Sequence, residues 1–491
     1  MIRWTSRATA ALAVGALLCV ASNAYAIPAF ARKYGTSCLT CHTVYPKLTP
    51  FGEAFRRNGY LFPGVDSDYV KQETIILGQE ANKKTFPNSV WPGTIPNSLP
   101  VAIGVNGQGF LIPKADSTAG RFGAQGGTTP AAPGTVVDLH SLVDEAHLWV
   151  GAALDDNITF WSELTVTADA TAEVENAQVL FNNLLGPKHA VNLIVGKGFP
   201  NVTSFGPHSS YLADQMVPNA PVGQLLGNTS EWQLVDHYTG LELNGVLGGM
   251  VDYAVGLNAG SAGIAAPTED FYGRVGVKLG GMRSDGEGSK GPQDTFKPWA
   301  ETALHLYGFG YRSNTRIDPA GVGDGTTFLA TNDVATTWGV GGRAQLDSLE
   351  LNAGWYQDKH NHGTDSATEA KAKVFWGELS YVLFPWLVPA IRVEYISLDQ
   401  QDATGASLPG VNVWHVQPGI AFLIRPNLKL VAVANWEKAN GFPTAGGAPG
   451  AWSGGSSAQG PIIIAPSPST VDANSSSTEF ESVGFFFAWA I

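Results

Sequence analysis

The chain has 491 residues, of which only 14% are charged, and a formal net charge of −13 at pH 7. This acidic balance argues against nucleic acid or anionic lipid as the main partner. No stretch after the first 26 residues offers about 18 continuous apolar residues, which argues against helical membrane spans. Two classes remain, a large soluble all-β domain and an outer-membrane β-barrel, and the 58 Gly and 14 Trp favour the barrel.

The first residues predict an export signal. A basic start is followed by an apolar run from Ala8 to Val20 and by the small residues of a cleavage site at Ala24-Tyr25-Ala26. The run is too short for a transmembrane anchor. We therefore expect residues 1–26 to be a cleaved signal peptide. The mature chain keeps two cysteines, Cys38 and Cys41, so no disulfide framework is expected despite export.

Residues Cys38-Leu39-Thr40-Cys41-His42 carry the attachment signature of a c-type haem. Each thiol can add to one vinyl group of the porphyrin, and the adjacent imidazole then ligates the iron. The same thiols could be half of a zinc site or a dithiol redox pair. Zinc needs two more ligands, and residues 27–99 contain no other Cys and no other His. We therefore predict one covalently attached haem c, held by Cys38 and Cys41, with His42 as the proximal axial ligand.

Residues 27–99 are expected to form a small haem segment at the periplasmic mouth of the barrel or within its pore. Thr49-Pro50 predicts the start of a short helix, because Thr caps well and Pro suits the first helical position. Phe51 and Phe55 would share one face of this helix, and Gly59 would end it. Because this segment is too short to enclose a haem by itself, we expect the haem to pack against the following domain.

From about Pro100 the sequence changes to period-two strands separated by breaks rich in Gly, Asn, Asp and Pro. Within 349–355, for example, Leu, Leu, Ala and Trp alternate with Glu, Asn and Gly. An apolar outer face with a polar interior is typical of a water-filled transmembrane barrel, whereas a soluble sandwich buries its apolar face. The strands are predicted near 100–112, 136–152, 158–168, 173–182, 190–198, 238–247, 250–258, 270–279, 298–312, 335–346, 348–357, 372–382, 387–397, 412–424, 427–437 and 480–491.

The breaks between these strands alternate between tight turns and long loops, which is the outer-membrane asymmetry of short periplasmic turns and long outer loops. Two breaks depart from it, since 280–297 is long where a turn is expected and 169–172 is short where a loop is expected. We predict an all-β fold: a transmembrane outer-membrane β-barrel of about 16 strands over residues 100–491, with a small, partly helical c-type haem segment at its N-terminus.

The residues around the haem motif resemble one family. Ile27-Pro28-Ala29-Phe30-Ala31-Arg32 precedes the motif, and Pro46-Lys47-Leu48-Thr49-Pro50-Phe51-Gly52 follows it. With the signal and the porin-length remainder, this plan looks like the fused monohaem cytochrome–porins of the outer membrane in iron-oxidising bacteria. The resemblance implies an outer-membrane ferrous iron oxidase that passes electrons inward. It also implies that Cys38 and Cys41 hold the haem and that His42 is its proximal ligand.

The second axial ligand of the haem is left open, because residues 27–99 offer no Met and no second His. Any single candidate is more often an ordinary polar or packing residue than a ligand. Besides water, the candidates are Lys33, Lys47, His147, His305, His415, Met216 and Met250.

Two further groups of residues could bind cations. Asp358, His360, His362 and Asp365 are expected in one outer loop, where they could gather Fe²⁺ or simply be solvated. Five glutamates are expected to face the lumen and give it an acidic character suited to cations, although general pore polarity explains them nearly as well. They are Glu145, Glu163, Glu301, Glu378 and Glu394.

We interpret the chain as an oxidoreductase-like electron conduit of the bacterial outer membrane, most simply an oxidase of extracellular Fe(II) that passes electrons to a periplasmic cytochrome. Its partners would be that electron carrier, an extracellular redox donor or acceptor, and outer-membrane lipid. Two alternatives stay open. The conduit could run outward to an external acceptor, or the protein could be a porin whose haem segment is a structural or sensory plug.

Overall fold

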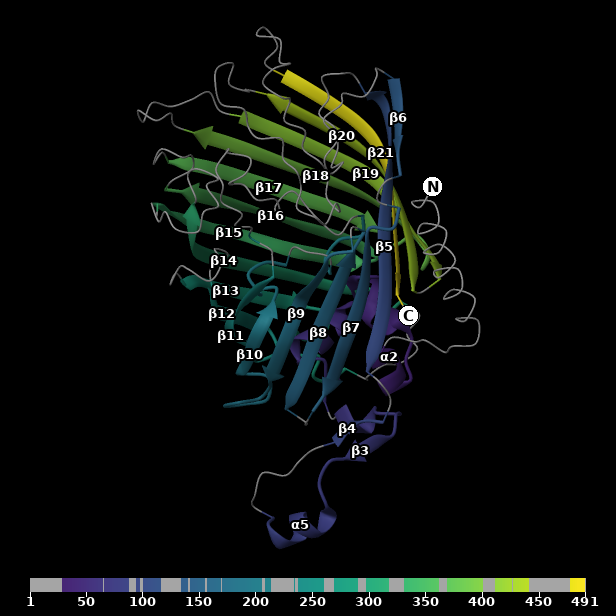
Figure 1. Cartoon of the computed structure of the whole chain (residues 1–491), viewed down its shortest axis with the longest axis vertical. Coiled ribbons are helices and arrows are strands. Elements are labelled where there is room, and N and C mark those ends of the chain that lie inside the picture. Colours follow the sequence, from purple (N-terminus) through teal and green to yellow (C-terminus); the bar gives the residue numbers. More distant parts are fainter. Residues whose placement is uncertain are drawn as a thin grey trace, which may run out of the picture.

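The computed structural model describes residues 29–64, 66–87, 94–97, 100–115, 134–139, 142–154, 157–168, 170–204, 208–212, 234, 237–259, 269–289, 297–317, 331–361, 369–400, 411–425, 427–440 and 477–490. The predicted signal peptide therefore lies outside the described residues. From Val101 onward the strands pair antiparallel with their neighbours and close into one barrel, in which the last strand pairs with the first (Figure 1).

The barrel strands run in chain order around the ring. They are β5 (Val101–Ala115), β6 (Gly134–Asp138), β7 (Glu145–Ala153), β8 (Ile158–Thr167), β9 (Ala172–Phe181), β10 (Asn192–Gly198), β11 (Tyr238–Leu247), β12 (Val251–Ala259), β13 (Glu269–Gly280), β14 (Glu301–Ile317), β15 (Thr331–Asp347), β16 (Leu349–His360), β17 (Ala370–Tyr381), β18 (Leu387–Gln400), β19 (Val411–Arg425), β20 (Leu428–Asn440) and β21 (Ser477–Ala490).

Two of these strands share one place in the ring. The outer half of β5 pairs with β6 and its inner half pairs with β7, so the seventeen named strands fill sixteen positions. The prediction of a barrel of about 16 strands is confirmed. The strand predicted as continuous over 136–152 is interrupted between β6 and β7, where the buried Asp144 accepts a hydrogen bond from Gln108 at 3.3 Å.

Side chains alternate between the two faces of the wall as the sequence predicts. Trp338 and Val340 of β15 are 49% and 54% exposed on the outer face, whereas Glu350 and Asn352 of β16 are 5% and 2% exposed inside. The apolar outer face and polar lumen are those of a transmembrane barrel. None of the helices in the described residues combines the length and hydropathy needed to cross a bilayer.

Short elements precede the barrel. They are α2 (Ala29–Tyr34), α3 (Cys38–Cys41), β1 (His42–Val44), β2 (Lys47–Leu48), α4 (Pro50–Arg57), a 3-10 turn (Asp66–Asp68), β3 (Thr74–Ile76), α5 (Glu80–Thr85) and β4 (Thr94–Pro96). The predicted short helix is confirmed as α4, in which the Thr49 hydroxyl accepts from the Gly52 amide at 3.1 Å. Gly59 follows the helix at φ +68°, a left-handed conformation that glycine adopts freely.

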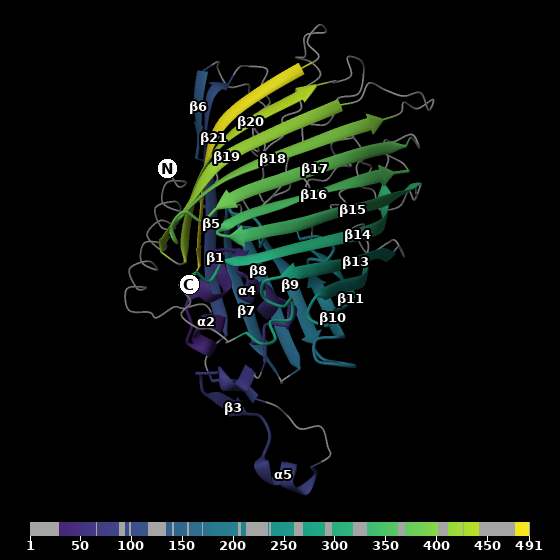
Figure 2. The same ribbon diagram turned by 180° about the vertical axis from the view of Figure 1, so that it is seen from behind.

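The part of this region from α2 to α4 lies inside the barrel. Lys47 pairs with Glu350 of β16, and Arg57 pairs with Asp252 of β12, so the plug is tied to two strands that are not neighbours in the ring. We call residues 29–62 the plug. Figure 2 shows α4 and β1 surrounded by strands, while β3, β4 and α5 project beyond the turn end of the barrel.

The two irregular breaks do not shift the strand count. The long connection between β13 and β14 is described at 281–289 and 297–300, and its first part packs on the plug, where Asn58 donates to the Asp285 carbonyl at 2.8 Å. The connection between β8 and β9 stays short, and the Thr167 amide donates to the Thr171 carbonyl across it at 2.9 Å. The length of the first connection is therefore explained by its contact with the plug.

The segment after β10 departs from the prediction of an outer loop. In its described parts, 199–204 and 208–212, it folds into the lumen, where Tyr211 and Leu212 are 2% and 0% exposed. The Tyr211 amide donates to the Glu378 carboxylate at 2.8 Å. We call residues 199–212 the inner loop. It closes over the plug, because the Leu48 amide donates to the His208 carbonyl at 3.0 Å.

Candidate haem site and the lumen around it

The two thiols lie on the one-turn helix α3. Ser37 caps this helix, since its hydroxyl accepts from the Leu39 amide at 3.2 Å. Residues three apart share one face of a helix, so Cys38 and Cys41 lie side by side. Both are free and partly accessible. Burial, and after it the neighbouring Cys38, raises the pKa of the Cys41 thiol to about 12, so the thiol is protonated at neutral pH.

The imidazole of His42 is held by its own strand pair. Its Nδ1 lies 3.0 Å from the Pro46 carbonyl oxygen, which accepts the ring proton and leaves Nε2 with a lone pair. Such a bond to the outer nitrogen is the usual way in which proteins orient a metal-binding histidine. Burial, and after it the nearby His208, lowers the pKa of His42 to about 4. The ring is therefore neutral at pH 7, the form that binds a metal.

These residues fit a c-type haem. Two neighbouring thiols and one oriented, neutral imidazole are the donors that such a group needs. An aromatic cluster of Tyr34, Phe51, Phe55 and Phe62 packs beside Cys41 and supplies apolar surroundings. Cys38 and Cys41 would hold the haem and His42 would ligate its iron, which would supply a one-electron carrier.

Helices α3 and α4 are locked together at this site. The Thr49 hydroxyl donates to the Thr40 carbonyl at 2.7 Å, and the Thr49 amide donates to the Cys41 carbonyl at 2.9 Å. A Cβ at Gly52 would lie 2.1 Å from the Cys41 carbonyl oxygen. The close approach of the two helices therefore requires glycine at position 52.

The two lysine candidates for the distal ligand have other partners. The Lys33 ammonium lies 3.0 Å from Asp66 and donates to the Tyr34 hydroxyl at 2.7 Å. The Lys47 ammonium lies 2.5 Å from Glu350 and is 1% exposed. Both lysines serve the plug as ion-pair partners in this arrangement.

The barrel candidates are also engaged. His305 and His415 face inward as predicted, and each lies 2.7 Å from a carboxylate, of Asp252 and Glu394 respectively. Met250 is 46% exposed at the turn after β11, and Met216 lies outside the described residues. The structure therefore does not single out a second axial ligand among these candidates.

Sequence reasoning missed His208. This residue belongs to the inner loop, and its Nδ1 lies 3.3 Å from the Pro46 carbonyl oxygen that also binds His42. Burial, and after it the charge of Arg56, lowers the pKa of His208, which favours its neutral form. A lone histidine in a long loop carries no sequence signal, because the contact joins residues 162 positions apart.

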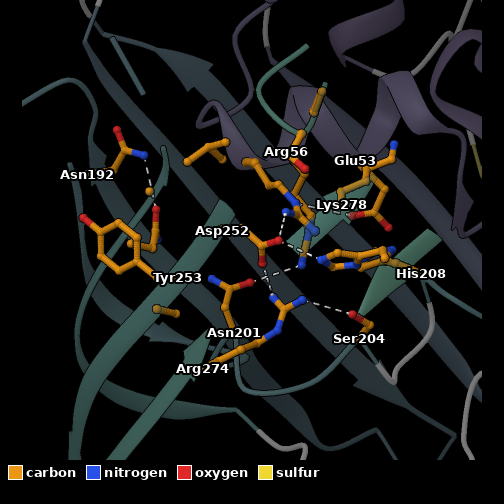
Figure 3. A pocket seen from close by; sticks show the side chains of 18 of the residues that line it. Glu53, Arg56, Asn192, Asn201, Ser204, His208, Asp252, Tyr253, Arg274 and Lys278 are labelled. Carbon is orange, nitrogen blue, oxygen red and sulfur yellow. Dashed lines mark hydrogen bonds and ion pairs between the residues drawn. The ribbon is translucent and has the colours of Figure 1, made fainter. Parts of the chain in front are cut away.

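A cavity separates the plug from the barrel wall (Figure 3). It has an empty volume of about 1610 Å³, part of it open solvent, with α4 on one side and strands β9 to β16 on the other. The prediction of an acidic lumen is wrong here, because six basic side chains outnumber two acidic ones. They are Arg56, Arg57, Arg274, Lys278, Arg283 and Arg343, against Glu53 and Asp252.

The five predicted lumen glutamates do face inward, but they differ in their partners. Glu301 binds Lys278 at 2.9 Å, and Glu378 binds Arg392 at 2.8 Å. Glu394 binds His415, while Glu145 and Glu163 both approach His147, at 3.5 Å and 3.1 Å. Basic partners therefore neutralise much of the acidic wall.

The expectation that Asp358, His360, His362 and Asp365 share one outer loop is wrong for the two residues that can be placed. Asp358 and His360 lie in β16, are 0% exposed, and are joined by a 2.8 Å bond between His360 Nε2 and Asp358. The Thr337 hydroxyl also donates to Asp358, at 2.7 Å. Because β16 extends to His360, these side chains lie on the lumen face of the strand, as Glu350 and Asn352 do. His362 and Asp365 lie outside the described residues.

Comparison with known proteins supports the fold and nothing beyond it. No protein-family model matches the chain, and no curated protein sequence matches it. Among solved structures, the chain is similar to the anion-selective porin from Comamonas acidovorans, with TM-score 0.50 and 11% identity over 80% of this chain and 99% of that one. OmpT of Vibrio cholerae, in vitro folded and in its trimer form, gives TM-score 0.47 and 12% identity over 80% and 99%. The chain thus has a porin-like barrel of the outer-membrane type.

Proposed function

We propose that the protein is an outer-membrane cytochrome–porin that carries single electrons across the membrane, oxidising extracellular Fe(II) and passing electrons to a periplasmic cytochrome. The observation that carries this proposal is the place of the haem-attachment motif. Cys38, Cys41 and His42 belong to a plug inside a closed, porin-like barrel, and ion pairs join this plug to two different strands, β12 and β16.

The position of the motif answers a physical problem. The apolar band of an outer-membrane barrel is about 25 Å tall, so a carrier on the periplasmic surface would be far from an external donor. A carrier attached in the lumen shortens the electron transfer from the external donor and the transfer to the periplasmic cytochrome. Two covalent links would keep it there, and the neutral ring of His42, oriented by the Pro46 carbonyl, is ready to ligate its iron.

The same residues would serve a conduit that runs outward. The ion pair between Lys47 and Glu350 would also serve a porin whose N-terminal segment is only a structural plug. The first alternative differs in the direction of electron flow and the second in the absence of redox exchange. An experiment on redox exchange therefore separates all three.

The test has two stages on the exported, full-length protein. A haemochrome spectrum of the denatured protein should show covalent haem, and its loss in a Cys41→Ala variant would assign the link. Stopped-flow spectroscopy in liposomes should then show rapid haem reduction when Fe²⁺ is added outside. Reduction only by a periplasmic-type cytochrome would favour the outward conduit. A chain without haem, or a haem that neither donor reduces, would overturn the proposal.

A further inference from the structure

One cluster of metal-ligating side chains lies on the barrel wall, apart from the Cys–His motif. Ligand atoms of His147, Glu163 and Glu175, from β7, β8 and β9, lie within 4.8 Å of one another. No other group of three such residues converges in this way in the part of the chain that the structure describes. Glu145 adds a fourth group, 3.5 Å from Nε2 of His147.

A β-bulge brings Glu175 into this cluster. Glu163 pairs with Asn176 while the next residue, Leu164, pairs with Val174, so Glu175 is the extra residue of β9. Val174 is 46% exposed and Asn176 only 6%, which places them on opposite faces of the wall. In a regular strand Glu175 would therefore face outward. Bulges often re-aim a side chain at a functional site, and this one turns a carboxylate inward.

The other ligands are held in position by neutral groups. Trp149 Nε1 donates to one oxygen of Glu163 at 2.7 Å, and Asn176 donates to the other at 2.6 Å. His147 Nδ1 lies 3.1 Å from the Thr165 hydroxyl. Hydrogen bonds of this kind orient metal ligands in known sites, and here they preorganise two of the three.

In the described residues, neither Glu163 nor Glu175 forms an ion pair with a lysine or an arginine. Elsewhere in the lumen Glu301, Glu350 and Glu378 each pair with a basic side chain. Within the described residues, Glu163 forms an ion pair only with His147, and Glu175 forms none. Partly buried carboxylates brought together without cationic side chains are costly unless a cation joins them.

A series of aromatic rings connects the cluster to the haem motif. The rings of His147 and Trp149 stack with centroids 5.2 Å apart. Tyr45 follows at 6.0 Å from Trp149, and His42 at 5.4 Å from Tyr45. The cluster is thus joined by ring contacts and by the Trp149–Glu163 hydrogen bond to the residue that would ligate the haem iron.

We infer that His147, Glu163 and Glu175 form a binding site for a divalent cation of the Fe²⁺ class, at which the external donor is held before it is oxidised. This inference rests on the proposed function for the identity of the cation. Imidazole and carboxylate ligands suit Fe²⁺ and Mn²⁺. Three donors spread evenly at about 2.1 Å from one ion lie about 3.6 Å from one another, so ligand atoms within 4.8 Å of one another need to close by about 1 Å.

Oxidation at this site is a one-electron step. Fe²⁺ held by the two carboxylates would lose one electron and become Fe³⁺, and Trp149 and Tyr45 would pass that electron to the oxidised haem that Cys38, Cys41 and His42 would hold. No bond to carbon or hydrogen changes and no proton has to move. The product, Fe³⁺, would leave toward the loop end of the barrel.

The test uses Mn²⁺, which binds similar ligands without reducing haem, and the full-length haem protein in detergent. Electron paramagnetic resonance should show one tight Mn²⁺ per chain. Glu175→Gln and Glu163→Gln should each weaken binding about tenfold or more, by analogy with losses at known metal sites. Glu173→Gln is the matched control, because Glu173 lies on the same strand, is 63% exposed and pairs with Lys197. Heat-modifiable gel migration reports that each barrel is folded.

Mn²⁺ binding that is absent in the wild type, or unchanged in folded Glu175→Gln, would overturn the inference and leave the proposed function standing. Slower haem reduction by Fe²⁺ in Glu175→Gln, with Glu173→Gln unchanged, would support both. Mn²⁺ binding that Glu175→Gln abolishes, with no haem reduction by Fe²⁺ in the wild type, would retain the cation site and refute the iron oxidase.

Discussion

The ion pair between the plug and the wall can be broken by one substitution, Lys47→Leu. Lys47 is 1% exposed, and its ammonium lies 2.5 Å from Glu350 and 3.0 Å from the Ser209 carbonyl. Leucine fills a similar volume but leaves the Glu350 carboxylate, itself 5% exposed, without its closest cation. We expect the docked state of the plug to lose stability.

The magnitude follows from the burial of both partners. Breaking a buried ion pair by removing one member costs about 3–5 kcal/mol, because the other charge stays buried and uncompensated. Arg343 also interacts electrostatically with Glu350 and offsets part of this loss. We therefore expect about 3 kcal/mol, the lower end of that range. Such a loss raises the population of undocked plugs by about two orders of magnitude.

Conductance of single barrels in planar bilayers measures this population. The wild type should be nearly closed, since the plug and the inner loop share the lumen. Lys47→Leu should open in bursts, and Glu350→Gln added to it should restore closure, because no carboxylate is then left buried without its lysine. The Leu48 amide donates to the His208 carbonyl, so its hydrogen should exchange faster in Lys47→Leu than in the wild type and slowly again in the double variant. A silent Lys47→Leu variant, or a double variant no better than the single one, would refute this reasoning.

Three other substitutions test the site. Gly52→Ala places a Cβ 2.1 Å from the Cys41 carbonyl oxygen, so it should cost about 1–3 kcal/mol and lower the haem content per folded barrel in a haemochrome assay. Burial alone would raise the pKa of Glu53, but its arginine neighbours outweigh it and hold that pKa at about 2. The ionised Glu53 carboxylate stabilises the folded state fully above the unfolded pKa of about 4.3, and this stabilisation is lost as the pH falls through about 2. Glu53→Gln should therefore lower the free energy of unfolding by up to about 3 kcal/mol at pH 7 and leave it unchanged near pH 2. Denaturant titration of the plug measures this difference. Arg392→Met leaves the buried Glu378 unpaired and should release the inner loop, seen as new protease cleavage in 199–212; an uncleaved loop would contradict this.

Sequence periodicity predicted the barrel because every strand of its wall meets the same two environments. The observed β11, for example, spans Tyr238–Leu247, the same range as its predicted strand, since lipid outside and water inside impose the alternation locally. The helix α4 was predictable for a similar reason, because Thr49 and Pro50 act within one turn.

The features that complete the lumen were not predictable in this way. The inner loop, the bulge at Glu175 and the ion pair of Lys47 depend on partners that are remote in the chain or on neighbouring strands. Period-two alternation even assigns Glu175 to the outer face, and only the shift in pairing between β8 and β9 turns it inward. Likewise, the extension of β16 to His360 removes two residues from the expected loop.

The closure of the barrel between its last strand and its first constrains how the protein is made. The plug precedes β5 in the chain, and the ring around it is complete only when β21 pairs with β5. Cys38 and Cys41 then lie inside the ring, where they are partly accessible to solvent but where an enzyme of protein size would not fit. Any group linked to these thiols has to be added while the chain is still in transit. If a haem is linked to these thiols, as proposed, biogenesis would therefore have a fixed order, with haem attachment first and assembly of the barrel around it second.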